Sequence, residues 1–530
     1  MNRARVIFHI ARADFFERVR RYSFLIMLGA VVFLGYQTGV GNVTMRLDQY
    51  RGEFNSAWVG SMMALIASFF LGWFGFYLVK GSVARDRETG VGQIMATTPI
   101  TRLVYVFGKW TSNFSVLVAM NLILALAAIG IQLLAGENRQ IDLYALFAPF
   151  LFIALPMMAM VAAAAVLFES VGFLSGGFGN VIYFFLFVMI FPLVDTLSKN
   201  NPALEPMGLA LIQQSAGAAA TAAFQEYGGG FVLGGTGVAN ELGLDLDPAS
   251  YIFQWNGVDW TPDIILKRLL FIGIALVFIS LASLFFDRFD PSRRKPGRMK
   301  IKSAASPPAP EAVPSSRVLS QPVHLTPLSF AANRFVFLRV LVFELKLLLK
   351  GKRWWWYAVA IGLIIAGIVN TPANAREYVL MLAWIWPILI WSGLGSREIQ
   401  NNTQQMLFSS ALPLWRQLPA QWLAGFIITV LSGSGVAIRL SMAGETAGLL
   451  AWLSGAIFIP SFALASGVWS SSHKLFEVLY MVLWYLGPLE QVPQINFMGT
   501  TGDGSVGFFM PLTFLLLVIA FAGRRRQLQV

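Results

Sequence analysis

Long uncharged, apolar stretches recur along the 530-residue chain, and they limit its fold more than any motif does. A helix of about 20 apolar residues crosses the roughly 30 Å hydrocarbon core of a bilayer. Only 12% of the residues are charged and 56% are hydrophobic, whereas about 25% of a soluble domain is charged. The sequence therefore predicts an all-α polytopic membrane protein. It excludes a disordered chain, a secreted disulfide scaffold and a compact soluble enzyme.

The uncharged windows predict about twelve transmembrane helices. The windows lie near 22–40, 57–79, 110–135, 143–168, 171–194, 269–286, 354–375, 378–396, 417–438, 446–472, 475–489 and 504–523. A further window, 206–225, is rich in Ala, Gly and Gln rather than Leu or Phe, so its insertion into lipid is only weakly favoured. We expect an interfacial or re-entrant helix there rather than a thirteenth span.

The distribution of positive charge predicts the orientation of the chain. Basic residues in short loops are retained on the cytoplasmic side of a membrane. With both termini in the cytoplasm, 31 of the 39 Lys and Arg lie on that side, and the acidic segment 195–265 lies outside. The net charge of +12 is thus mainly an orientation signal, and we expect a multi-pass protein of the cell membrane.

A Pro-rich basic segment, 288–330, divides the chain into two similar halves, 1–287 and 331–530. No packed element fits its composition, so this segment is a predicted cytoplasmic linker. Each half is expected to contain six spans and to open with an amphipathic elbow helix, at 1–21 and 331–352.

The order of motifs after the second span of each half also repeats. An Arg-acid pair comes first, and a Pro-x-x-Arg step follows it. Because each match is weak alone, it is their shared order and position that favours duplication. The repeated residues are Arg85, Asp86, Pro99 and Arg102 in the first half, and Arg397, Glu398, Pro413 and Arg416 in the second.

The loop 80–109 has a composition suited to contact with another protein. Its first part is dense in charge up to Gly90, and a run of small and apolar residues then continues to Pro99, which ends or redirects a helix. We predict a short helix across the cytoplasmic mouth, with its charges free to bind a partner. The alternative interpretation is that these charges only set topology and solvate helix ends.

In this loop the sequence resembles the membrane subunits of ATP-binding-cassette transporters of the ABC type-2 permease class. Those subunits have an elbow helix, six spans and, between spans 2 and 3, an Arg/Glu-rich segment followed by Thr, an apolar helix and Pro-x-x-Arg. The resemblance implies that the loop is a coupling helix that docks into an ATPase subunit. The implied coupling residues are Arg85, Asp86, Arg87, Glu88, Thr97, Pro99 and Arg102, with Arg397, Glu398, Pro413 and Arg416 in the second loop, 396–417.

The second loop departs from the family's pattern, because Ile399, Gln400, Asn401 and Asn402 stand at its acidic and glycine positions. The resemblance implies a permease that forms the translocation pathway of an exporter, with two separate ATPase subunits as partners. It also implies that the two halves together form a pseudo-dimer, which is the complete transmembrane unit in this family. A lipid, a peptide or another amphipathic compound is the expected cargo.

The chain lacks the motifs of an enzyme active site. It contains no Gly-x-x-x-x-Gly-Lys-Ser/Thr loop, so ATP and Mg²⁺ are expected on the partner subunits. It has no cysteine and no His-Glu-x-x-His motif, and its three histidines lie far apart. We therefore expect no enzyme activity of its own, no bound metal or cofactor, and no nucleic-acid partner.

A secondary active carrier of the major facilitator type is the alternative, because twelve spans in two halves of six also describe that architecture. Gly81, Asp86, Arg87 and Gly90 come close to its loop motif, but each gap is one residue too long. Ion-coupled carriers also need ionisable groups within the membrane. The predicted span interiors are almost free of charge, and the acidic residues nearest to them lie at span ends: Glu169, Asp195, Glu445 and Glu477.

Overall fold

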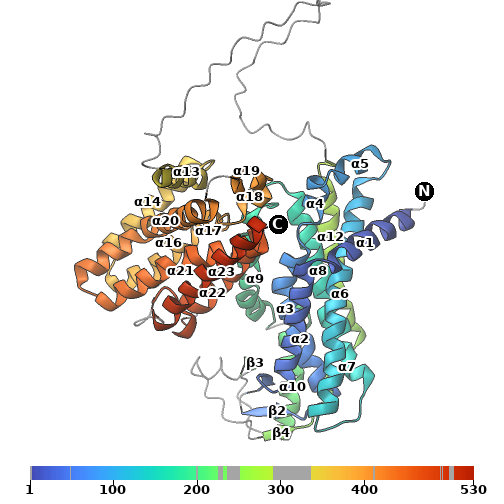
Figure 1. Cartoon of the computed structure of the whole chain (residues 1–530). Coiled ribbons are helices and arrows are strands. Elements are labelled where there is room, and N and C mark those ends of the chain that lie inside the picture. Colours follow the sequence, from blue (N-terminus) through green and yellow to red (C-terminus); the bar gives the residue numbers. More distant parts are fainter. Residues whose placement is uncertain are drawn as a thin grey trace, which may run out of the picture.

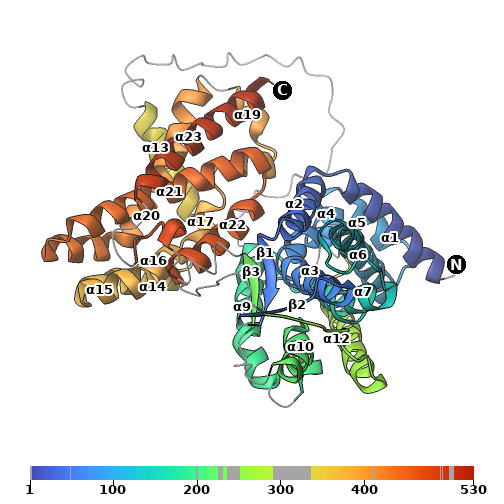
Figure 2. The ribbon, with the colours of Figure 1, turned by 90° about the horizontal axis from the view of Figure 1, so that it is seen from below.

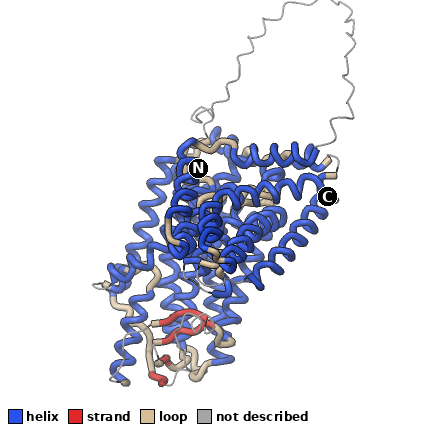
Figure 3. Tube along the Cα trace, turned by 90° about the vertical axis from the view of Figure 1, so that its left-hand side faces the viewer, coloured by secondary structure: helices blue, strands red, loops and turns tan. Residues whose placement is uncertain are grey.

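The computed structural model is mostly helical (Figure 1), and its short strands lie at one end of the molecule (Figure 3). The predicted linker 288–330 lies outside the described residues beyond residue 289, as do residues 331–335 of the second predicted elbow and much of the segment 195–265. The described residues are 3–47, 49–198, 201–224, 231–235, 251–289, 336–409, 412–489, 491, 493–500 and 506–529.

Seven helical segments among the described residues are long and apolar enough to cross a membrane. The number rises to nine if each of two sharply bent helix pairs is one span. These segments fit a multi-pass all-α membrane protein, but the prediction of about twelve spans is wrong. The seven are Ser56–Glu88, Arg102–Ala135, Leu143–Ser170, Pro262–Phe285, Pro413–Ala443, Thr446–Ser470 and Val506–Gln529.

Three further predicted spans are not among these seven segments. The span predicted at 378–396 is interrupted at Pro387, because proline lacks a backbone N–H and clashes with the preceding turn. The helix within 475–489 continues to Leu489 through a π-helical turn, but it is too short to count among the seven. The span predicted at 171–194 is helical only from Gly177. The helices in these regions are α9 (Gly177–Ser198), α16 (Leu380–Ile385), α17 (Ile388–Trp391) and α22 (Lys474–Trp484).

The first half is a helix bundle. Its main helices are α1 (Arg3–Val19), α2 (Tyr22–Gly39), α3 (Ser56–Val79), α6 (Arg102–Ala135), α7 (Leu143–Pro149), α8 (Leu155–Ser170) and α12 (Pro262–Phe285). In this bundle α8 packs against α12, and α6 packs against α3 and α1. The axis of α1 is inclined by 74° to that of α2, so α1 forms a separate arm against α6 (Figure 1).

Two small sheets, which the all-α prediction did not include, lie at the end of the first half that is remote from α4 (Ser82–Glu88) and α5 (Val91–Thr97) (Figure 1). One pairs β1 (Val43–Arg46) antiparallel with β3 (Val232–Gly235), and the other pairs β2 (Tyr50–Gly52) parallel with β4 (Tyr251–Phe253). In the chain, α10 (Leu209–Ala223) lies between β2 and β3. This helix occupies the window 206–225 and packs near β4. Its 15 residues are fewer than the roughly 17 of the shortest spans.

The second half has its own bundle. Its main helices are α13 (Val336–Leu349), α14 (Trp354–Val369), α20 (Pro413–Ala443), α21 (Thr446–Ser470) and α23 (Val506–Gln529). Here α21 packs against both α20 and α23, and α14 packs against α20. The bend between α13 and α14 is 103°. The two halves lie side by side (Figure 2), and α22 of the second half contacts α9 and α3 of the first.

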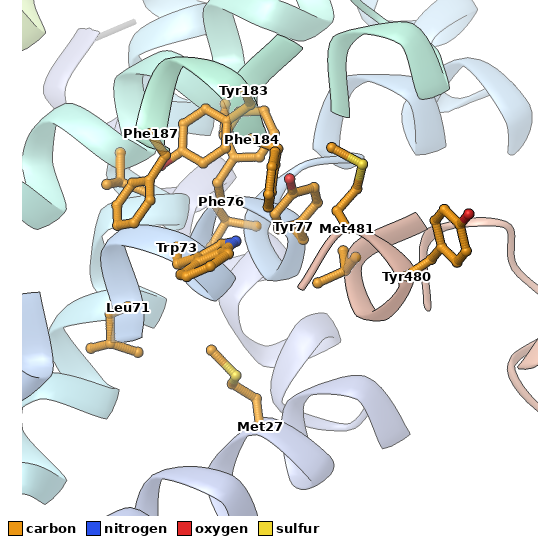
Figure 4. Close-up of a cluster of buried hydrophobic side chains, with 14 of the residues drawn as sticks. Met27, Leu71, Trp73, Phe76, Tyr77, Tyr183, Phe184, Phe187, Tyr480 and Met481 are labelled. Carbon is orange, nitrogen blue, oxygen red and sulfur yellow. The ribbon is translucent and has the colours of Figure 1, made fainter. Parts of the chain in front are cut away.

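Aromatic side chains fill the region where the halves meet (Figure 4). Within the first half, Phe76 and Tyr183 stack with their ring centroids 3.6 Å apart. Across the halves, the ring of Trp73 lies 6.1 Å from that of Tyr485, and the ring of Phe185 lies 6.1 Å from that of Trp484. Aromatic rings therefore supply much of the apolar contact between the halves.

The close approach of α14 to α20 depends on glycine. A Cβ atom on Gly367 would lie 2.8 Å from the backbone nitrogen of Val436, whereas a Cβ on Gly362 of the same helix would meet nothing within 4 Å. We expect Gly367→Ala to destabilise the protein by about 1–3 kcal/mol through overpacking. Gly362→Ala should be neutral or stabilising by up to about 1 kcal/mol through helix propensity. Thermal unfolding in detergent checks the pair, and equal midpoints would contradict this packing.

Candidate functional site

The predicted coupling loop of the first half folds into two short helices. They are α4 (Ser82–Glu88), which carries the charges, and α5 (Val91–Thr97), which is apolar. Glycine begins each helix with a positive φ, +116° at Gly81 and +77° at Gly90, a backbone conformation that other residues adopt rarely. We call residues 80–102 the first loop. It lies at the same end of the molecule as the second loop, described below (Figure 1).

A buried carboxylate holds the start of α4. Glu169, at the end of α8 and 4% exposed, accepts hydrogen bonds from the backbone N–H groups of Ser82 at 3.0 Å, Val83 at 2.5 Å and Ala84 at 3.3 Å, and also from Gly81. An acceptor at a helix N-terminus satisfies N–H groups that have no partner within the helix. The sequence analysis placed Glu169 only at a span end, because a contact between residues 87 positions apart leaves no local pattern.

Arg85 and Asp86 join the first loop to the elbow helix and to α6. Arg85 forms an ion pair with Glu17 of α1. Asp86 lies 2.7 Å from Nζ of Lys109, and it accepts a hydrogen bond of 2.6 Å from the hydroxyl of Tyr105. Lys109 is 2% exposed and also pairs with Asp14 of α1 at 2.7 Å. A buried cation between two carboxylates therefore fixes α1, α4 and α6 together.

Arg87 ties the first loop to the end of α12. Its guanidinium donates to both carboxylate oxygens of Asp287 at 3.0 Å and lies 5.8 Å from the ring centroid of Phe289. The neighbouring Arg288 donates to the carbonyl of Thr98 at 2.8 Å. The chain after the last span of the first half is thus bonded to both helices of the loop.

The other predicted residues of the first loop are more exposed to solvent. Glu88 is exposed and forms no ion pair with any described residue. The hydroxyl of Thr97 donates to the carbonyl of Ile94 at 2.8 Å, and Pro99 is exposed between α5 and α6. Arg102 begins α6 and is half-buried. Among these four, Glu88 presents an exposed charge that a partner could contact.

The second loop, residues 396–417, contains α18 (Arg397–Gln400) and α19 (Gln404–Phe408). Arg397 pairs with Glu344 of α13 at 2.8 Å. Glu398, which is 4% exposed, accepts a hydrogen bond from Gln421 and lies 3.5 Å from the guanidinium of Arg524. The predicted Pro413 begins α20, and Arg416 is half-buried in its first turn.

The contacts of the two loops repeat in space. In each, the arginine pairs with a glutamate of the elbow helix, and the following acid bonds to residues 19 and 23 positions further along α6 or α20. Matched residues of the two loops are separated by a constant 312 positions: 85 and 397, 86 and 398, 105 and 417, 109 and 421, and 110 and 422. Pro99 and Arg102 do not follow this separation, because Pro413 and Arg416 each lie two positions beyond the matching place.

An exposed apolar residue also recurs at this separation. Ile94 on α5 is 67% exposed, and Met406 on α19 is 72% exposed. Leu103 and Trp415, at the starts of α6 and α20, are 51% and 66% exposed. Apolar side chains that are exposed at equivalent positions of two loops indicate surfaces that contact another protein.

A polar cluster links the halves beside the first loop. We call Lys80, Asn180, Lys474 and Glu477 the interface cluster. Nζ of Lys80 donates to Oδ1 of Asn180 at 2.7 Å, and Nδ2 of Asn180 donates to Glu477 at 2.6 Å. Lys474 donates to the carbonyl oxygen of Lys80. Burial lowers the pKa of Lys474.

Asn180 and Glu477 occupy equivalent positions, since each is the fourth residue of its helix, α9 or α22. Contact between equivalent residues is what an approximate two-fold axis between two similar halves produces. The sequence analysis gave no role to Asn180 or Lys474 and placed Glu477 at a span end. Their pairing spans 297 residues and could not be read from local pattern.

Comparisons with known proteins supply no family for the chain. No protein-family model matches the sequence, and a search of curated proteins finds no significant match. Within the described part of the chain, no group of three or more His, Cys, Asp or Glu is placed to hold a metal ion. The functional interpretation therefore rests on the two loops and on the contacts that hold them.

The buried charge of Lys109 makes Asp86 important for stability. We expect Asp86→Asn to lower the free energy of unfolding by about 1–3 kcal/mol, because Lys109 loses one carboxylate but retains Asp14. Glu88→Gln, a change of the same kind on the same helix, should alter it by less than about 0.5 kcal/mol. Thermal unfolding of the purified variants measures both. An Asp86 variant as stable as the Glu88 variant would show that the pair contributes nothing.

Proposed function

We propose that the chain is the membrane-spanning permease subunit of an ATP-binding-cassette exporter of the ABC type-2 class. The observation that carries this proposal is the repeated loop geometry: two loops, 312 residues apart, each carry an Arg–Glu ion pair to the elbow helix and an exposed apolar residue at the matching position. Two equivalent surfaces on one chain suit two copies of one partner. In this proposal the partner is a separate ATPase subunit, which binds ATP and Mg²⁺.

The exposed side chains of the loops have the character of a docking surface. Protein interfaces place apolar anchors at the centre and polar residues at the rim. Ile94 supplies such an anchor in the first loop, with the exposed Glu88 and Arg85 beside it. Met406 supplies it in the second loop, where the exposed rim is made of amides such as Gln400 and Asn401.

The ion pairs between the first loop and the neighbouring helices can transmit a movement of the loop to the rest of the protein. Arg85, Asp86 and Arg87 bind α1, α6 and the end of α12, so a push on α4 is carried to three other helices. At the start of α4, the carbonyl of Lys80 accepts a hydrogen bond from Lys474 of the other half. A displacement of the first loop would therefore alter the contact between the halves, and ATP-driven closure of the partners would open the pathway outward.

The remaining assignments follow from this proposal. The loop end of the molecule is cytoplasmic, both termini lie on that side, and the protein resides in the cell membrane. The chain has no ATPase site of its own and binds no cofactor. Its cargo is amphipathic or apolar, a lipid, a peptide or a similar compound. The aromatic contacts between the halves, such as Trp73 with Tyr485, suit such a cargo.

A secondary active carrier is the second candidate, and one observation favours it. Glu477 and Lys80, 2% and 4% exposed, are buried ionisable groups at the contact between the halves. Carriers driven by protons or sodium use such groups to couple ion and solute movement. Transport by the purified chain on a proton gradient alone would support the carrier and would contradict the exporter.

The apolar anchors test the docking proposal. We expect Ile94→Asp to weaken binding of an ATPase subunit encoded beside the chain by about thirtyfold, the effect of losing an anchor worth about 2 kcal/mol. Met406→Asp should weaken it at the second loop. Ile94→Met, which places the side chain of the second loop in the first, is the matched control and should bind normally. Binding to the detergent-solubilised chain is measured by titration, and unchanged affinity in both Asp variants would remove the loops from the interface.

A further inference from the structure

The corner between α13 and α14 concentrates positive charge. The chain turns there through Gly351, whose φ is +83°, and the two helices meet at 103°. We call Lys346, Lys350, Lys352 and Arg353 the basic corner. Lys346, Lys350 and Arg353 are exposed, and Lys352 is half-buried. Four bases lie within eight residues of the chain.

No described carboxylate neutralises the basic corner. The only acid of α13, Glu344, is 5% exposed and turns inward to Arg397 at 2.8 Å. Burial lowers the pKa of Lys352, and no ion pair with a described residue offsets that effect. An anion from outside the described chain would stabilise all four charges.

The corresponding corner of the first half differs. Arg21, between α1 and α2, donates to both oxygens of Glu17 at 3.0 and 2.5 Å. Glu17, the elbow glutamate of the first half, thus pairs with a base of its own corner as well as with Arg85. Glu344, the elbow glutamate of the second half, forms its ion pair with Arg397 and none with the basic corner. A carboxylate therefore pairs with one base of the first corner, whereas no described carboxylate pairs with the basic corner.

Apolar surface on both sides places the basic corner at the membrane surface. Trp354 and Trp355, which follow the bases directly, are 80% and 45% exposed. On α14, Ile361, Ile365 and Val369 are 57%, 54% and 74% exposed. A helix with this outer face lies in hydrocarbon, and exposed Trp residues mark the level of the headgroups.

The amphipathic α13 completes this placement. Its exposed side chains include Leu338, at 53%, and Phe343, at 60%. With the apolar α14 inserted in the bilayer, the 103° bend makes α13 lie nearly in the membrane plane, with these side chains toward the acyl chains. The bases at its end then stand level with the lipid phosphates.

We propose that the basic corner binds the headgroups of anionic phospholipids, with Trp354 and Trp355 packed against the lipid below the phosphate. Near an anionic surface each Lys or Arg strengthens binding by about fivefold. Three bases in the turn, Lys350, Lys352 and Arg353, together account for roughly a hundredfold preference over a zwitterionic lipid. This inference does not depend on the proposed function, because any membrane-spanning role leaves the corner at the bilayer surface.

Lipid binding to the full detergent-solubilised chain tests the inference. Native mass spectrometry measures the retention of phosphatidylglycerol and phosphatidylcholine at increasing lipid concentration. We expect Lys350→Gln/Lys352→Gln/Arg353→Gln to lose most of the preference for phosphatidylglycerol and to bind phosphatidylcholine as the unaltered chain does. Lys350→Arg/Lys352→Arg/Arg353→Lys keeps the charges and should keep the preference. Arg21→Gln, which removes a base already paired with Glu17, should change it by less than about twofold.

Two outcomes would overturn the inference. Equal retention of phosphatidylglycerol by the Gln and the charge-preserving variants would show that the bases do not bind lipid. Displacement of phosphatidylglycerol by millimolar inorganic phosphate would assign the corner to a free anion instead of a membrane lipid.

Discussion

The buried carboxylate of Glu169 positions α4, and the charged end of the first half depends on this contact. Four consecutive backbone N–H groups, from Gly81 to Ala84, donate to its two oxygens. A carboxylate buried without such donors would cost several kcal/mol, so Glu169 and α4 stabilise each other. With the start of α4 fixed, Arg85, Asp86 and Arg87 are directed toward three different helices.

The second half reaches a similar arrangement with different charges. In the first loop the half-buried Asp86 is paired with the buried Lys109 of α6. In the second loop the position equivalent to Lys109 is Gln421 of α20, and the buried Glu398 has its nearest cation in Arg524 on the last helix. Each of these two acids therefore has a cation within reach, which offsets the cost of burying charge. The change of partner also links the C-terminal helix to the second loop.

The features that were predictable from sequence are those with a local period or a local motif. Apolar windows located the long helices, and the Arg-acid pairs marked the residues that join the loops to the elbows. Pro387 interrupted one predicted span, because hydropathy averages over a window and gives no weight to a missing N–H. The strands β1 to β4 are three or four residues long and pair across about 190 or more positions, too short and too distant for a periodic signal.

The interface cluster was hidden for the same reason, since Asn180 and Glu477 meet only when both halves are folded. Hydropathy treats Glu477 as a polar interruption at a span end and Asn180 as one within a span. The positions of Glu169 and Lys474 have the same explanation as that of Glu477. Charged residues at the ends of apolar helices can set topology, or they can join elements distant in sequence, and the structure places these three in the second group.

One cross-link tests the central claim that ATPase activity of the partner subunits changes the contact between the halves. The chain has no cysteine, so Phe185→Cys/Trp484→Cys introduces the only pair, at rings whose centroids lie 6.1 Å apart. We expect efficient cross-linking by a short thiol reagent in the complex without nucleotide. Trapping the ATPase subunits with ATP and vanadate should lower the yield severalfold as the pathway opens outward. The same yield with and without trapped nucleotide would contradict the account.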